Sequence, residues 1–225
     1  PHERARAGTS QVASGCRVCA LAMAMAALGD GEREDFRKQG IIAVQGTDLL
    51  GRRIVRVVGR HVFVRQLDRE HLRQFVLEEL TAAAEEPEGY VILYVHSEFT
   101  WAENSVGPWW LRAAYERAPP ALRDQLRMVY VLHPTLSLRC VLNVVGLFCS
   151  GRLVQDKVQF VHRSEFLSEY MGDGEYTLPD FVGEHDRTLE DNPLWDYGLA
   201  TTPEVQAYMR GELGLQAPSG GSMQQ

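Results

Sequence analysis

Two long apolar segments, residues 90–95 (YVILYV) and residues 126–132 (LRMVYVL), constrain the fold of this chain more than any other feature. The first is a continuous apolar run and the second is interrupted only by Arg127, so both lack the strict alternation of a strand with one solvated face. They are typical of parallel strands that are covered on both faces. Residues 53–59 and 157–161 form two further predicted strands, and helical patterns separate all four. This alternation predicts an α/β fold with parallel pairing and right-handed crossovers.

The helices between these strands carry recognisable start signals. Asp68 is a plausible N-cap for residues 69–84, and Pro108 suits the first turn of a helix that the pair Pro119-Pro120 ends. Residues 136–149 form an apolar helix that stops at Ser150-Gly151, and a short helix capped by Ser164 is expected over residues 164–170.

The 225 residues divide into three predicted segments. Residues 1–31 are an N-terminal helical extension with a helix over 12–28, residues 32–186 are the α/β domain, and residues 187–225 are a C-terminal extension that is flexible unless a partner binds it. Ten acidic residues and two arginines fall between positions 163 and 196, where a solvated surface is expected.

Composition excludes several classes of protein. A net charge of −7 argues against a nucleic-acid binder, and no apolar stretch is long enough for a transmembrane segment. The four cysteines form no disulfide framework, and the lone Cys16-x-x-Cys19 pair lacks a second pair at zinc-binding spacing. We therefore expect a cytoplasmic protein, or an organellar one if residues 1–29 belong to a targeting region.

Histidines follow three of the predicted strands: His96, His133 and His162. Ligands of open parallel sheets bind beyond the carboxyl ends of strands, where such imidazoles could hold zinc or act as a general base. The alternative is that each histidine hydrogen-bonds the backbone at a strand end. The chain has no HExxH, GxSxG or P-loop motif, so we expect no metal, no catalytic residue and no enzyme. An enzyme would need one of these histidines beside a nucleophile or a metal.

The helix over residues 136–149 is apolar around most of its circumference. Its apolar residues include Leu138, Val141, Leu142, Val145 and Phe148. A helix of this kind is either packed on all sides or faces an apolar ligand, and both readings remain open.

Five motifs in this order resemble the divergent CRAL-TRIO family, which includes BCH domains. They are GRRIVRVVGRHV at 51–62, YVILYVHSEFT at 90–100, WWLRAAYERAP at 109–119, VYVLHPT at 129–135 continuing to KVQFV at 157–161, and TLPDFVGEHD at 177–186. The resemblance covers residues 40–186 and implies a mixed, mostly parallel sheet flanked by helices, with a hydrophobic pocket.

The resemblance also implies function. Lipid-carrying members bind phospholipids or other hydrophobic molecules, whereas BCH-type members are mainly scaffolds that bind small GTPases or associate with themselves. We expect a non-catalytic protein-interaction scaffold, with lipid in an apolar pocket under a gate helix that carries Leu138, Val141, Leu142, Val145 and Phe148. Arg139, Arg152 and Lys157 are candidate head-group contacts by their charge. The alternatives are a lipid-transfer protein, or a subunit of a large assembly, held through its surface and extensions, with a vestigial pocket.

Overall fold

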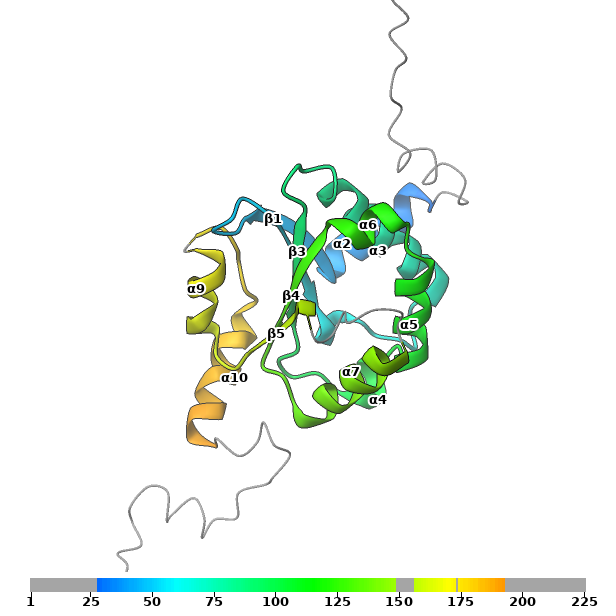
Figure 1. Cartoon of the computed structure of the whole chain (residues 1–225). Coiled ribbons are helices and arrows are strands. Elements are labelled where there is room, and N and C mark those ends of the chain that lie inside the picture. The colour runs from blue at the N-terminus through cyan, green and yellow to red at the C-terminus, as the bar shows by residue number, and fades with distance from the viewer. Residues whose placement is uncertain (1–27, 149–155, 173, 193–225) are drawn as a thin grey trace, which may run out of the picture.

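The computed structural model of the chain describes residues 28–148, 156–172 and 174–192. In this part of the chain a sheet has the strand order β1-β2-β3-β4-β5 (Figure 1). The strands are β1 (Ile42–Thr47), β2 (Arg53–Val58), β3 (Tyr90–Val95), β4 (Leu126–Leu132) and β5 (Val158–Val161). β1 runs antiparallel to β2, and all other neighbours are parallel. The predicted mixed, mostly parallel sheet is confirmed.

Helices connect the parallel strands on one face of the sheet. α3 (Arg69–Ala83) links β2 to β3, and α7 (Leu136–Phe148) lies between β4 and β5. Between β3 and β4 come α4 (Trp101–Asn104), α5 (Pro108–Arg117) and α6 (Pro120–Gln125). The parallel strands follow one another in a single direction across the sheet. Right-handed crossovers therefore place all of these helices on the same face. Figure 1 shows α3, α5 and α7 there, and α9 (Ser168–Met171) and α10 (Asp180–Asp191) on the opposite face.

The two faces of the sheet belong to two different cores. In β3, Val91, Leu93 and Val95 pack toward the side of α9 and α10, together with Met171 from α9 and Val182 from α10. Tyr90 alternates with them and packs toward α3 instead. Burial on both faces explains why the sequence of β3 is apolar without interruption.

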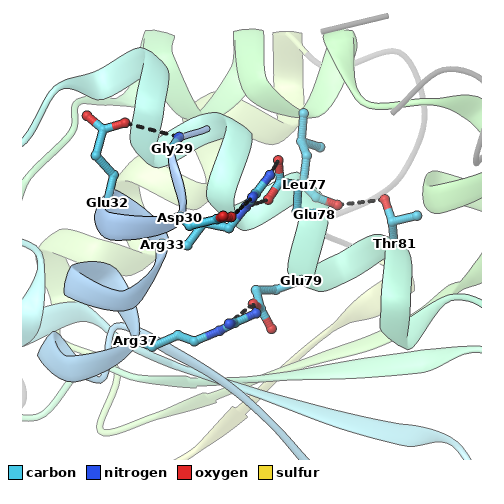
Figure 2. Close-up of polar contacts among 9 residues, drawn as sticks. All are labelled: Gly29, Asp30, Glu32, Arg33, Arg37, Leu77, Glu78, Glu79 and Thr81. Carbon is cyan, nitrogen blue, oxygen red and sulfur yellow. Dashed lines mark hydrogen bonds and ion pairs between the residues drawn. The ribbon is translucent and has the colours of Figure 1, made fainter. Parts of the chain in front are cut away.

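The first described helix, α2 (Asp30–Gln39), is attached to α3 by two ion pairs (Figure 2). The Arg33 Nε donates to the Glu78 carboxylate at 2.8 Å, and the Arg37 Nη2 donates to Glu79 at 2.9 Å. Near these ion pairs the Phe36 ring of α2 stacks on Phe75 of α3, with ring centroids 5.0 Å apart. α2 is therefore held by both polar and apolar contacts.

Local capping explains the helices that were predicted. The Asp68 Oδ1 accepts the backbone N–H groups of Glu70 at 2.8 Å and His71 at 3.0 Å, which starts α3 as expected. Pro108 is the first residue of α5. The segment predicted as one helix from Ser164 is instead a 3₁₀ helix, η2 (Ser164–Leu167), followed by α9, and the Ser164 side chain does not cap it.

Several elements were not predicted, among them α2, β1, α4, α6 and α10. The predicted N-terminal helix over 12–28 lies outside the described residues, apart from Leu28, which is buried in the core under α2 and α3. In the described part of the chain no helix is long and apolar enough to cross a bilayer.

Candidate functional site: an apolar cavity

A cavity of about 350 Å³ lies between the sheet and the crossover helices. Its floor is formed by strand residues that point away from α9 and α10, including Val57, Ile92, Val129 and Val158. Its walls come from α3, α5, α6 and α7. The helix residues that line it include Leu72, Val76, Leu80, Trp110, Leu111, Ala114, Tyr115, Leu122, Leu138, Val141 and Leu142. The cavity therefore lies on the face of the sheet that the crossover helices cover.

Two tyrosines place hydroxyl groups in this apolar floor. The Tyr90 hydroxyl donates to the Leu122 carbonyl of α6 at 3.1 Å. The Tyr94 ring lies against Gly59, where a Cβ atom would stand 2.5 Å from the Tyr94 hydroxyl oxygen. Burial raises the pKa of both tyrosines, so both hydroxyls stay protonated and can only act as hydrogen-bonding groups.

The predicted gate helix is α7, and its residues divide into three groups. Leu138, Val141 and Leu142 line the cavity. Val145 is buried but is not one of the described lining residues, and the side chain of Phe148 lies outside the described part of the structure. α7 is not packed on all sides, because Leu136 and Val144 are exposed.

The predicted head-group residues lie elsewhere. The Arg139 Nη2 is 3.2 Å from the Nε2 of His162, and its guanidinium carbon lies 5.4 Å from the centroid of the Phe160 ring. The Lys157 Nζ donates to the Leu126 carbonyl at 2.6 Å and the Arg123 carbonyl at 3.2 Å. Neither Arg139 nor Lys157 is among the described residues that line the cavity, and Arg152 lies outside the described residues.

Two arginines that the sequence did not single out do line the cavity, Arg73 of α3 and Arg123 of α6. Arg123 was missed because Pro119-Pro120 was read only as the end of α5. Pro120 is also the first residue of α6, and proline at the first position of a helix is a start signal. That signal could have revealed α6 and its arginine.

The histidine at the end of β3 is held neutral by its surroundings. His96 is buried; its Nε2 lies 3.1 Å from the Thr135 hydroxyl, and its ring stacks on Phe99 with centroids 4.5 Å apart. Burial, together with the neighbouring His185 and His133, lowers the pKa of His96 to about 3. It therefore carries no charge near neutral pH.

The histidine at the end of β4 joins the sheet to α10. The His133 Nδ1 lies 2.7 Å from the Ser97 hydroxyl, and its Nε2 lies 2.8 Å from the Asp186 carboxylate. Asp186 also accepts hydrogen bonds from the hydroxyl and backbone N–H of Ser164. Burial opposes ionisation of Asp186, but the hydrogen bonds from His133 and Ser164 outweigh it and lower the pKa.

This serine–histidine–carboxylate series brings a histidine beside a hydroxyl nucleophile, as an enzyme would require. Ser97 is 0% exposed and His133 is 1% exposed, and neither is among the described residues that line the cavity. A substrate cannot reach the Ser97 hydroxyl in this conformation, so the series acts as a structural tie. The described residues contain no group of three side chains that could hold a metal ion.

A mixed sheet with crossover helices on one face and an apolar cavity beneath them defines a class of α/β domain. Residues 51–188 match the model of the divergent CRAL/TRIO domain family, and the chain belongs to that family. The resemblance seen in the sequence is thereby confirmed.

Several curated proteins are similar to this chain. Protein GDAP2 homolog of Nematostella vectensis is 28% identical over 152 residues, covering 68% of this chain and 30% of the relative. Rho GTPase-activating protein 1 of Homo sapiens is 27% identical over 161 residues, covering 69% of this chain and 35% of the relative. Caytaxin of Mus musculus is 29% identical over 99 residues, covering 44% of this chain and 26% of the relative. The chain thus spans about a third of the length of the GDAP2 homolog and of Rho GTPase-activating protein 1.

Proposed function

We propose that this chain is a non-catalytic binding domain that holds a small hydrophobic ligand between its sheet and α7. The cavity of about 350 Å³ carries this proposal. Ligand-binding pockets span roughly 300–1,000 Å³ and are mostly apolar with a few polar groups, whereas packed interiors contain few voids larger than a water molecule. A void of this size therefore favours ligand binding over a vestigial pocket.

A second proposed role is that of a protein-interaction scaffold linked to small GTPases. Its support is the similarity to Rho GTPase-activating protein 1 and to Rho GTPase-activating protein gacY of Dictyostelium discoideum. The exposed Trp109 and Leu111 of α5 offer apolar contact area for a partner. Ligand binding and scaffolding are compatible, because the cavity lies beneath the helices and leaves their outer surfaces accessible.

The test of ligand binding is extraction of the natively purified chain with organic solvent, followed by mass spectrometry of the extract. We expect a hydrophobic molecule in near-stoichiometric amount. Leu142→Trp should abolish its recovery, because the larger ring occupies the cavity. Val144→Trp is the matched control, since Val144 lies on the same helix but is 44% exposed.

Recovery from both variants alike would show that the ligand binds outside the cavity. An empty extract from the folded wild-type protein, together with no uptake of an apolar fluorescent probe, would contradict ligand binding. It would leave the scaffold role, to be tested by pull-down with purified Rho-type GTPases and Trp109→Ser as the variant.

A further inference from the structure

We propose that the cavity takes a single-chain amphiphile with an anionic head group, and that Arg123 binds that head. This inference rests on the proposed ligand-binding function and adds the chemical class of the ligand. Its basis is the difference between the two arginines that line the cavity.

Arg73 already has a partner. Its Nε donates to the Glu70 carboxylate at 3.0 Å, and Glu70 raises the pKa of the Arg73 guanidinium. The charge of Arg73 is therefore balanced within the protein, and a ligand has little to gain from it.

Arg123 is different. Its Nε is buried and meets no hydrogen-bond acceptor in the described part of the chain, and no described carboxylate pairs with its guanidinium. The guanidinium carbon lies 5.8 Å from the ring centroid of Tyr115, which also lines the cavity. Arg56 and Arg139 have a buried Nε as well, but their terminal nitrogens contact Thr177 and His162 respectively. Arg123 thus brings to the cavity a buried Nε that has no hydrogen-bond acceptor among the described residues.

Lys157 is a second cation near Arg123. The Lys157 ammonium donates to the Arg123 and Leu126 carbonyls, and Leu126 is itself a lining residue. Among the described ion pairs none joins Lys157 to a carboxylate. Lys157 is not among the described residues that line the cavity and its ammonium is held by these two carbonyls, but its positive charge adds to the potential that an anionic head group would meet at Arg123.

Size decides between ligands with one chain and ligands with two. The volume of about 350 Å³ lies near the lower end of the range for small-molecule pockets. One alkyl chain along the apolar lining, with its head at Arg123, suits this volume better than a two-chain phospholipid. The anionic oxygens could belong to a carboxylate or to a phosphate monoester, because a guanidinium pairs with both.

The experiment is isothermal titration of the delipidated full chain with decanoate, decyl phosphate and decanol, all below their micelle concentrations. We expect decanoate or decyl phosphate to bind at least about tenfold more tightly than decanol, as a charged hydrogen bond implies. The tighter of the two anions identifies the head group. Arg123→Met should remove this tenfold preference and leave decanol binding unchanged.

Two further variants make the result specific. Arg123→Lys should retain part of the preference, because it keeps the charge. Arg117→Met, at the exposed end of α5, changes the net charge equally and should have no effect. Circular dichroism melting of each variant verifies folding, so that lost binding is not mistaken for unfolding.

Equal affinity for decanol and both anions, or equal weakening of all three by Arg123→Met, would overturn the anionic head group and leave the proposed function intact. If none of the three ligands binds the folded wild-type chain, the proposed function fails, and this inference fails with it.

Discussion

His96 ionises very differently in the folded and the unfolded chain. Its pKa in the fold is about 3, against an ordinary value of 6.5. As pH falls from 6.5 toward 3, the unfolded chain takes up a proton at this position and the folded chain does not. The free energy of unfolding therefore decreases over that range, by about 1.4 kcal/mol per pH unit where the unfolded histidine is fully protonated.

We predict that His96→Phe makes the stability of the protein less sensitive to pH between about 6 and 4. Phenylalanine keeps the stacking on Phe99 but cannot ionise. Urea unfolding at a series of pH values measures the slope. Thr135→Val removes the partner of the His96 Nε2 and leaves the ionisable groups unchanged, so it should shift the curve without altering the slope. Parallel curves for wild type and His96→Phe would contradict the prediction.

Asp186 affects stability with the same sign as His96 but over a lower pH range. Its pKa is lowered in the fold from the ordinary value of 3.8, so its stabilising effect is complete above about pH 4 and is lost as pH falls through the folded pKa. Asp186→Asn should lower the free energy of unfolding at pH 7 by about 2 kcal/mol, since it loses charged hydrogen bonds to His133 and Ser164. Chemical denaturation measures this loss. Glu190→Gln, an exposed position of the same helix, should change stability by less than about 0.5 kcal/mol.

At the scale of elements, the attachment of α2 to α3 shows which kind of contact dominates. The ion pair between Arg37 and Glu79 is conspicuous in Figure 2, but the Arg37 side chain is 58% exposed. Exposed pairs of this kind contribute about 0.2–1 kcal/mol. Phe36 is buried and stacks on Phe75, and truncating a buried phenylalanine costs about 3–5 kcal/mol. Apolar burial therefore accounts for most of the attachment.

This comparison predicts the outcome of a double-mutant cycle. Arg37→Ala and Glu79→Ala together should give a coupling energy of about 0.5 kcal/mol that disappears in 1 M salt, on the order expected for screened surface charges. Phe36→Ala should destabilise the protein by about 3 kcal/mol or more at any salt concentration. Thermal and urea denaturation measure both. A coupling energy as large as the destabilisation by Phe36→Ala would show that the ion pair, and not apolar burial, dominates the attachment of α2 to α3.

The sequence predicted those elements whose local signals agree with their surroundings. β3 and β4 are apolar on both faces, and Asp68 caps α3 as expected, so their bounds agree closely with the prediction. β1 was missed because an edge strand is defined by the strand that it pairs with. α10 was missed because its acidic character suggests a solvated surface, yet Val182 and Leu189 are buried on one side of it.

The candidate site, like the fold, could be predicted from the sequence only in part. Apolar character placed Leu138, Val141 and Leu142 on an apolar helix, and the family resemblance suggested that this helix is a gate. All three residues line the cavity. Charge alone suggested Arg139 and Lys157 as head-group contacts. In the structure Arg139 contacts His162 and Lys157 donates to a backbone carbonyl, and the sequence does not reveal such contacts. The proline start signal could have placed Arg123 on a helix, but only the structure shows that its Nε lies at the cavity without an acceptor.

At the scale of the whole molecule, the decisive property is the cavity of about 350 Å³ between the sheet and the crossover helices. Unfolding eliminates that void, and the volume change on unfolding becomes more negative as the void grows. We predict that Leu142→Trp, which fills the cavity, reduces the magnitude of this volume change relative to wild type. Fluorescence-detected pressure unfolding measures it, with Val144→Trp as the control for an added indole. If the volume change on unfolding is the same for Leu142→Trp and wild type, the cavity is filled in solution.

The order of the elements along the chain also determines which side of the sheet is covered first during synthesis. Among the described residues, the strands and the helices on the cavity side are all encoded before residue 162, whereas η2, α9 and α10 follow it. A nascent chain that has emerged only that far has one uncovered side of this sheet, on which Ile54, Val91, Leu93 and Leu132 would meet water. Exposed apolar surfaces of this kind favour aggregation. The contact between Asp186 and His133 can form only later, once the segment that covers this side has been made.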